Sequence, residues 1–207
     1  MSLEKAIKEH ALDYFNVVSG YPISENESLL ILGLESNPQR DLDYFEKNNN
    51  RLAMKGFEKH VKPRLERIIN SFTELRISSE PIGKMGYCLK GTPDFINYKT
   101  IAIKTGLGKR GKNSLIINHL FGPRLRFAVL KLNIRLEVPQ DYRDEESPFC
   151  KDCSICIDEC PEKILESYRM VDVTKCLSNI INNPTLIEGK PVNMCDICLN
   201  RCPANNI

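Results

Sequence analysis

Cysteines organise the C-terminal quarter of the chain. One run reads Cys150-Lys151-Asp152-Cys153-Ser154-Ile155-Cys156-Ile157-Asp158-Glu159-Cys160-Pro161, and a shorter run reads Cys195-Asp196-Ile197-Cys198-Leu199-Asn200-Arg201-Cys202-Pro203. The chain has 207 residues and 9 cysteines, of which Cys88 alone lies outside the interval 150–202. Such a lopsided distribution argues against a disulfide framework spread through a fold.

The spacing of the first run predicts iron–sulfur ligation. Cys-x2-Cys-x2-Cys-x3-Cys-Pro is the ferredoxin pattern, in which three cysteines wrap one cubane and the fourth binds the other cluster. The second run repeats this spacing, including the final proline, with one cysteine fewer. Cys176 lies between the runs and supplies the eighth thiolate. We therefore predict two [4Fe–4S] clusters with crossed ligation. One set of ligands is Cys150, Cys153, Cys156 and Cys202, and the other is Cys160, Cys176, Cys195 and Cys198.

Zinc is the alternative metal, because four cysteines also bind it. The three-cysteine loop and its partial repeat favour iron–sulfur over the paired knuckles of zinc ribbons. Residues 1–10 alternate in charge and have no apolar signal region, and no apolar run approaches the ~20 residues that cross a bilayer. These features predict a cytoplasmic protein without a membrane partner, in a reducing compartment where thiols remain available as ligands. We interpret Cys88 as a buried free thiol.

The sign of the local net charge changes shortly before the first cysteine run. Residues 95–136 contain no acid and nine bases, whereas residues 137–160 contain eight acids and two bases. The acid- and proline-containing stretch 137–149 is therefore the expected boundary. We predict two domains, residues 1–138 and residues 139–207.

Hydrophobic periodicity predicts mixed secondary structure in the first domain. Apolar residues at helical spacing predict a helix from Leu3 to Val18, ended by residues 20–22. Short strands are expected at 29–34 and 75–78, and strict alternation predicts a strand over 128–138. Residues 39–72 have helical spacing, with Pro63 expected to break or kink the helix.

A glycine loop precedes the long predicted strand. Gly106-Leu107-Gly108-Lys109-Arg110-Gly111 matches the dinucleotide fingerprint, but the acid expected about 20 residues later is missing, since none occurs before Glu137. A plain tight turn with a solvated basic face is one interpretation. The other is a turn whose backbone N–H groups and neighbouring bases hold a large anionic or amide-rich ligand. The predicted cofactor-binding residues are Gly106, Gly108, Gly111, Lys112 and Asn113.

The glycine loop and the cysteine runs together resemble epoxyqueuosine reductase and, more distantly, the corrinoid-dependent reductive dehalogenases. The matching stretch, from about residue 98 to 203, includes residues 102–108, 111–115 and 121–122 and both cysteine runs. This resemblance implies an α+β fold, with a nitroreductase-like N-terminal domain that holds cobalamin and a ferredoxin-like module with two [4Fe–4S] clusters. The chain departs from the longer relatives in ending five residues after Cys202, so we expect a short form without their C-terminal helical-repeat region. The family's proton-donating aspartate would fall at Thr92, two positions before Asp94, so the catalytic acid stays unknown.

The leading functional hypothesis is an iron–sulfur oxidoreductase that passes electrons to cobalamin or directly to a substrate in the N-terminal domain. The alternative is a non-enzymatic electron-transfer protein or redox subunit with the same two clusters. A nucleic-acid-binding protein is a third class, and it depends on the basic segment 95–136 alone. Expected partners are an electron donor such as a ferredoxin or flavodoxin and an unknown small-molecule or nucleic-acid substrate.

Overall fold

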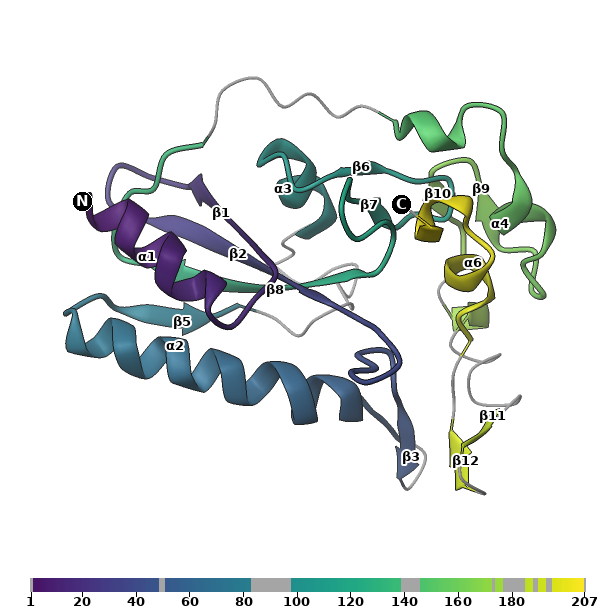
Figure 1. Ribbon diagram of the computed structural model, residues 1–207, viewed down its shortest axis with the longest axis horizontal. Helices are drawn as coiled ribbons and strands as arrows, with labels where there is room; N and C mark the ends of the chain where they lie inside the picture. Colours follow the sequence, from purple (N-terminus) through teal and green to yellow (C-terminus); the bar gives the residue numbers. More distant parts are fainter. Residues whose placement is uncertain are drawn as a thin grey trace.

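A four-stranded antiparallel sheet forms the centre of the molecule, with strand order β1-β2-β8-β5 (Figure 1). The computed structural model describes residues 2–48, 51–82, 98–138, 146–172, 174–176, 185–187, 190–192 and 195–206. The four strands are β1 (Val17–Pro22), β2 (Ser28–Glu35), β8 (Leu125–Leu132) and β5 (Ser79–Pro81). The helices that cover the sheet are α1 (Leu3–Leu12), α2 (Lys62–Glu74) and α3 (Tyr98–Lys104). The chain is thus a mixed α/β structure.

The two central strands are buried on both faces, which explains their nearly continuous apolar sequence. Leu30 of β2 and Leu130 of β8 face one core, which also contains the buried residues of α1 and α2. Ile31 and Val129, each adjacent in sequence to one of these leucines, face a second core with α3. Successive strand residues point to opposite faces of the sheet. The side chains of β2 and β8 therefore alternate between two apolar cores and not between a core and solvent.

Helix α1 is shorter than the sequence predicts. Its N-cap is Ser2, whose side chain accepts a hydrogen bond from the Lys5 backbone N–H at 3.3 Å, and it ends at Leu12. The predicted continuation to Val18 is wrong, because Val18 and the residues expected to end the helix, 20–22, lie in β1. Val17 and Val18 are β-branched and pair with β2, so strand pairing outweighs the helical spacing.

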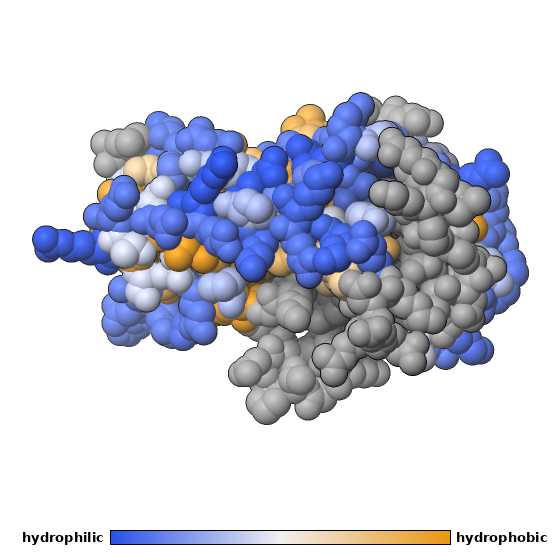
Figure 2. Space-filling model, turned by 90° about the horizontal axis from the view of Figure 1, so that it is seen from below, coloured by the Kyte–Doolittle hydropathy of each residue, from blue (hydrophilic) through white to orange (hydrophobic). Residues whose placement is uncertain are grey.

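A five-residue π-helix, η1 (Phe57–Val61), leads into α2. Pro63 is the second residue of α2 and directly follows the change from π-helical to α-helical geometry, so the helical stretch changes character at the position where the sequence predicts a break or kink. Leu65, Ile68 and Phe72 bury the inner side of α2. Seen from below, the face of the molecule that includes α2 is mainly hydrophilic (Figure 2).

Two predicted strands occur at shifted positions. The strand expected at 75–78 is β5, at Ser79–Pro81, because α2 continues to Glu74 and Arg76 then adopts a left-handed conformation with φ 60°. The strand expected over 128–138 runs from Leu125 to Leu132. It stops there because Leu132 pairs with Ser28 and Ser79, the first residues of both neighbouring strands.

The remaining elements are short. In the first part of the chain they are β3 (Glu46–Asn48), β4 (Arg51–Ala53), β6 (Lys109–Arg110) and β7 (Ile116–Ile117). After the sheet they are η2 (Pro148–Cys150), α4 (Ile155–Asp158), β9 (Leu165–Glu166), β10 (Arg169–Met170), β11 (Thr185–Ile187), β12 (Lys190–Val192), α6 (Ile197–Asn200) and η3 (Pro203–Asn206). In the described part of the chain, no helix has the length and apolarity to cross a membrane. The division into domains 1–138 and 139–207 stays a prediction.

Gly122 is the point where the C-terminal segment packs against the turn before β8. Gly122 has φ +51°, and a Cβ atom there would collide with the carbonyl oxygen of Ala204. Ala204 is 1% exposed and lies two residues after Cys202. A side chain at position 122 would therefore disturb the segment that holds this cysteine.

We expect Gly122→Ala to lower the free energy of unfolding by about 3 kcal/mol, from left-handed backbone strain together with overpacking. Urea unfolding of the full chain measures this loss. Gly106→Ala is the matched control, since it imposes the same backbone strain at φ +77° in a half-buried turn. An equal loss in both variants would show that the contact with Ala204 adds nothing.

Candidate metal centre

The first cysteine run is folded as a series of tight turns. Cys150 ends η2, Cys156 lies in α4 and Cys160 follows α4, and each of the three is 8% exposed. The segment before the run is attached to the glycine loop, because the Ser147 backbone N–H donates to the Arg110 carbonyl oxygen at 2.9 Å. The glycine loop and the first cysteine run are therefore neighbours in space.

The second run approaches the first through α6. Cys198 lies in α6, which packs against α4, and Cys202 follows α6 with its N–H donating to Leu199 O at 3.2 Å. Cys176 and Cys198 pack against a small apolar cluster that contains Cys156 and Cys160. Cysteines that are far apart in sequence are thus brought together by the packing of two short helices.

The cysteines of the first predicted set lie close enough together to raise one another's pKa values. Burial, followed by the nearby thiols of Cys150, Cys202 and Cys153, raises the pKa of Cys156 to about 11. Burial also raises the pKa of Cys202, with Cys150 and Cys153 adding to the rise and a hydrogen bond from the Ala204 N–H opposing it. Cys202 therefore lies among the cysteines of the first run, although it belongs to the second run in sequence.

The second predicted set shows the same pattern. Burial, followed by Cys176, Cys195 and Cys156, raises the pKa of Cys198 to about 12. Burial, followed by Cys195 and Cys160, raises the pKa of Cys176 to about 11. The Cys156–Cys198 interaction crosses between the sets, and the ligation itself stays a prediction.

The donor chemistry fits an iron–sulfur group. Eight thiols in two neighbouring groups are soft ligands of the kind that iron–sulfur clusters and zinc select. Among the described residues, no three His, Cys, Asp or Glu side chains converge closely enough to hold a single metal ion. A cubane does not require its ligands to converge on a single ion, because each thiolate binds a separate iron. Burial raises the pKa values of Cys156, Cys176, Cys195, Cys198 and Cys202, so binding of a metal by these thiols must release protons.

The glycine loop is a compact turn at the end of α3. Gly106 has φ +77° and ends α3 in the left-handed conformation. A Cβ on Gly108 would lie 2.6 Å from the Ile116 side chain, so Gly108 allows the loop to pack on β7. The Gly111 N–H donates to Leu115 O at 2.8 Å. This hydrogen bond means that the Gly111 N–H is engaged within the loop itself.

Lys112 and Asn113 contact both cysteine runs. The Lys112 backbone N–H donates to Cys150 Sγ at 3.4 Å, and its Nζ donates to the Cys153 carbonyl oxygen at 3.0 Å. Asn113 Nδ2 donates to the Cys198 carbonyl oxygen at 3.2 Å. The structure therefore gives these two residues of the predicted cofactor loop partners in the cysteine module. Their role toward a cofactor stays a prediction.

Asn113 links the glycine loop to α6, and its removal should loosen that link. Asn113 is 2% exposed, and its Oδ1 also accepts a hydrogen bond from the Leu115 N–H at 3.1 Å. We expect Asn113→Ala to lower the free energy of unfolding by about 2 kcal/mol, because two partly buried backbone groups lose their partner. Chemical denaturation measures the change. Asn26→Ala, at an exposed loop position, should change stability little, and equal losses would contradict the linking role.

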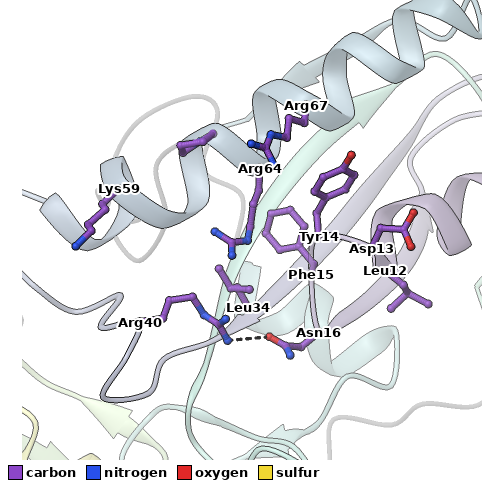
Figure 3. A pocket seen from close by; sticks show the side chains of 11 residues that line it. Leu12, Asp13, Tyr14, Phe15, Asn16, Leu34, Arg40, Lys59, Arg64 and Arg67 are labelled. Carbon is purple, nitrogen blue, oxygen red and sulfur yellow. Dashed lines mark hydrogen bonds between the residues drawn. The ribbon is translucent and has the colours of Figure 1, made fainter.

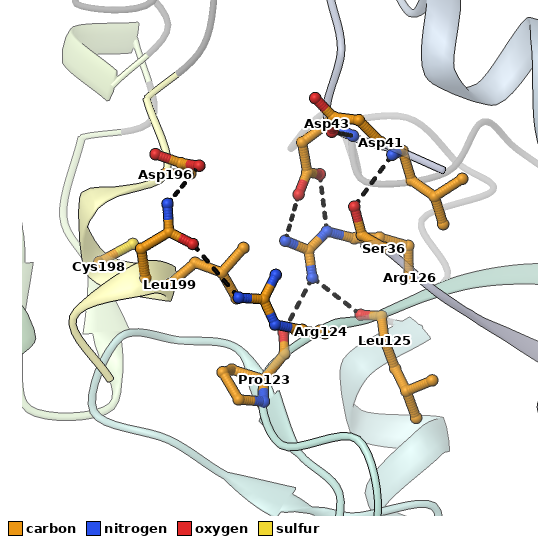
Figure 4. Close-up of polar contacts among 12 residues, drawn as sticks. Ser36, Asp41, Asp43, Pro123, Arg124, Leu125, Arg126, Asp196, Cys198 and Leu199 are labelled. Carbon is orange, nitrogen blue, oxygen red and sulfur yellow. Dashed lines mark hydrogen bonds and ion pairs between the residues drawn. The ribbon is translucent and has the colours of Figure 1, made fainter. Parts of the chain in front are cut away.

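A partly buried ion pair that sequence reasoning missed lies beside the second cysteine run. Arg126 Nε and Nη2 donate to the two carboxylate oxygens of Asp43 at 2.7 and 2.5 Å (Figure 4). Burial lowers the pKa of Arg126, but Asp43, with smaller contributions from Cys198 and Asp41, raises it above its ordinary value. The pKa of Asp41 is raised, mainly by burial and further by Asp43 and Asp196. No local sequence signal joins Asp43 to Arg126, because they are 83 residues apart.

Three residues named from the sequence lie outside the described part of the chain. They are Cys88, Thr92 and Asp94. The interpretation of Cys88 as a free thiol and the choice of a catalytic acid therefore stay predictions.

Comparison with known proteins confirms the resemblance noted in the sequence. An epoxyqueuosine reductase of Leadbetterella byssophila is 31% identical over 189 residues, 87% of this chain and 59% of the relative. The structure of epoxyqueuosine reductase from Streptococcus thermophilus matches with a TM-score of 0.67 at 15% identity, covering 100% of this chain and 67% of that one. A catabolic reductive dehalogenase matches with a TM-score of 0.55 at 11% identity, covering 94% and 27% of the two chains. No protein-family model matches the chain. The chain thus spans about three fifths of its curated relative, and the structural matches establish the fold.

Proposed function

The chain is homologous to the epoxyqueuosine reductases, and on that premise we propose that it is an iron–sulfur oxidoreductase that uses two [4Fe–4S] clusters. The clusters would deliver electrons to an acceptor or substrate held by a nitroreductase-like N-terminal domain. Cobalamin is the candidate acceptor, as the resemblance to the corrinoid-dependent dehalogenases implies. The C-terminal module would be ferredoxin-like.

One observation carries the proposal, namely the grouping of the thiols. Cys202 adds to the raised pKa of Cys156 in the first run, and Cys160 adds to the raised pKa values of Cys176 and Cys195. This grouping supports one cluster on Cys150, Cys153, Cys156 and Cys202 and another on Cys160, Cys176, Cys195 and Cys198. When bound, such clusters supply one-electron transfer. Cys156 of the first set adds to the raised pKa of Cys198 of the second set. This proximity supports electron transfer between the two clusters.

The chain's own groups near the first set would position it and adjust its reduction potential. The Lys112 N–H already donates to Cys150 Sγ, and hydrogen bonds to cluster sulfurs alter reduction potentials. The Lys112 ammonium donates to the carbonyl oxygens of Lys151 and Cys153 and so fixes the loop between these cysteines. Because residues 106–113 are the predicted acceptor loop, the same segment would serve both the first cysteine set and the acceptor.

Substrate and partners follow from the relatives as proposals. The curated relatives are named for epoxyqueuosine reduction. We propose a reductive reaction on a small molecule or on a modified nucleic acid, with a ferredoxin or flavodoxin as electron donor.

The test is metal and cofactor analysis of the full chain, purified without oxygen. We expect about eight iron and eight sulfide per chain, as two cubanes require, together with the optical spectrum of [4Fe–4S] clusters. Cys88→Ser is the matched control, since it removes the cysteine assigned to neither set and should keep all of the iron. Stoichiometric zinc in place of iron would overturn the proposal.

A second measurement separates the enzyme from an electron carrier. We expect cobalamin to bind the anaerobic protein and its absorption to change when the protein is chemically reduced. Failure to bind corrin would remove cobalamin and leave the iron–sulfur assignment standing. Protein that reduces a partner enzyme rapidly but turns over no small-molecule or nucleic-acid substrate would establish the alternative, a redox subunit.

A further inference from the structure

A cavity lies on the opposite side of the sheet from the glycine loop. It is about 600 Å³ in volume and lies between the end of α1, the end of β2 and the start of α2 (Figure 3). Phe15 and Leu34 form part of its wall and belong to the core that packs against α1 and α2, whereas Leu107 of the glycine loop belongs to the core of α3. The cavity is therefore distinct from the predicted cofactor loop.

Positive charge dominates the lining of this cavity. Its basic members are Arg40, Lys59, Arg64 and Arg67. Asp13, on the rim, is the acidic member, and its side chain is 72% exposed. Glu35 balances Arg40, at 3.6 Å, but among the described residues no carboxylate pairs with Lys59, Arg64 or Arg67. The lining thus has an excess of positive charge that the described protein does not neutralise.

Local structure directs Arg40 and Arg64 toward one region of the cavity. Arg64 and Arg67 are three residues apart on α2 and so share one face of the helix. Arg64 Nη1 donates to the His60 carbonyl oxygen of the π-helix η1, which anchors the guanidinium. Arg40 donates from Nε to Glu35 O at 2.8 Å, and Figure 3 shows its guanidinium and that of Arg64 directed toward the same region beside Leu34. π-helical turns are rare and frequently occur at functional sites.

The electrostatic consequence is mutual repulsion. Burial, followed by the charges of Arg40 and Arg67, lowers the pKa of Arg64. Burial, followed by Lys59, Arg64 and Arg40, lowers the pKa of His60. A fold that keeps like charges this close gains most from an anion that binds among them, because arginine pairs with phosphate through parallel, charge-assisted hydrogen bonds.

We propose that this cavity binds a small organic phosphate, with the phosphate between Arg40, Arg64 and Arg67 and an apolar or aromatic part against the wall. The volume is that of a small-molecule site. The apolar side chains of Leu12, Phe15 and Pro63 line the same cavity, which suits a ligand with a non-phosphate portion such as a nucleoside. The proposal does not depend on the iron–sulfur assignment.

Calorimetric titration of the full chain with AMP, with adenosine and with inorganic phosphate tests this. We expect AMP to bind, and adenosine, which lacks the phosphate, to bind at least about tenfold more weakly, as loss of charge-assisted hydrogen bonds predicts. Inorganic phosphate should compete with AMP. Arg64→Gln and Arg67→Gln should each weaken AMP binding by about tenfold or more.

Lys62→Gln is the matched control, because it removes a positive charge from the same helix outside the cavity lining. It should leave AMP binding unchanged. Arg67 is exposed, so its variant should fold even if the Arg64 variant does not. Equal affinity for AMP and adenosine, an equal effect of Lys62→Gln, or binding of an RNA stem loop without any binding of AMP would each overturn the proposal.

Discussion

Cys202→Ser is expected to remove the cluster assigned to the first cysteine run and to leave the cluster on the remaining set intact. Iron should fall from about eight to about four per chain, because one of the two cubanes loses a ligand. The surviving cluster should give the EPR signal of the set that contains Cys195 and Cys198. These two cysteines are the sequence neighbours of Cys202. Iron analysis and EPR of the anaerobically reduced protein measure both quantities.

The reason for this expectation is the position of Cys202 after α6. The turn that ends this helix carries Cys202 toward Cys150 and Cys153, which raise its pKa, whereas Cys198 lies within α6 and is influenced by Cys176 and Cys195. Cys198→Ser is the matched control and should remove the opposite cluster. If both variants lost the same EPR signal, ligation would follow sequence order and the crossed assignment would be wrong.

The sequence predicted the character of the central strands better than their ends. Residues 29–34 and 128–132 were recognisable because their apolar side chains must be buried. Their limits depend on partners, and Leu132 ends β8 since both neighbouring strands begin opposite it. Likewise, Val18 has the spacing of a helix residue, but its pairing with Leu32 places it in β1. Such pairing is long-range and leaves no local signal.

The candidate site divides in the same way. Cysteine spacing is local and specific, so the two sets could be named from the sequence alone. The contacts of Lys112 with Cys150 and Cys153, and the ion pair between Arg126 and Asp43, join segments 38 to 83 residues apart. In the sequence, Arg126 is only one base of the segment 95–136. Its partner, Asp43, is identified by the fold, which brings the turn after β2 against β8.

Arg126→Met is expected to destabilise the protein by about 3 kcal/mol, because it leaves the Asp43 carboxylate without its partner in a partly buried site. The Arg126 side chain is 14% exposed and that of Asp43 is 28% exposed. Arg126 Nη1 also donates to the carbonyl oxygens of Pro123 and Leu125 at 3.0 Å each, so two backbone acceptors lose a donor as well. Thermal and urea unfolding of the full chain measure the loss.

A double-variant cycle separates the ion pair from simple packing. Combining Arg126→Met with Asp43→Leu removes both charges, and we expect it to recover part of the stability lost in Arg126→Met, since no unpaired carboxylate remains. The exposed pair of Lys131 and Glu27, at 2.6 Å, is the control, and Lys131→Met should cost no more than about 1 kcal/mol. Purely additive losses in the cycle would mean that Arg126 stabilises the region through its backbone contacts alone. Recovery would instead identify the charge pair as the element that fixes β8 against the turn after β2, beside Cys198.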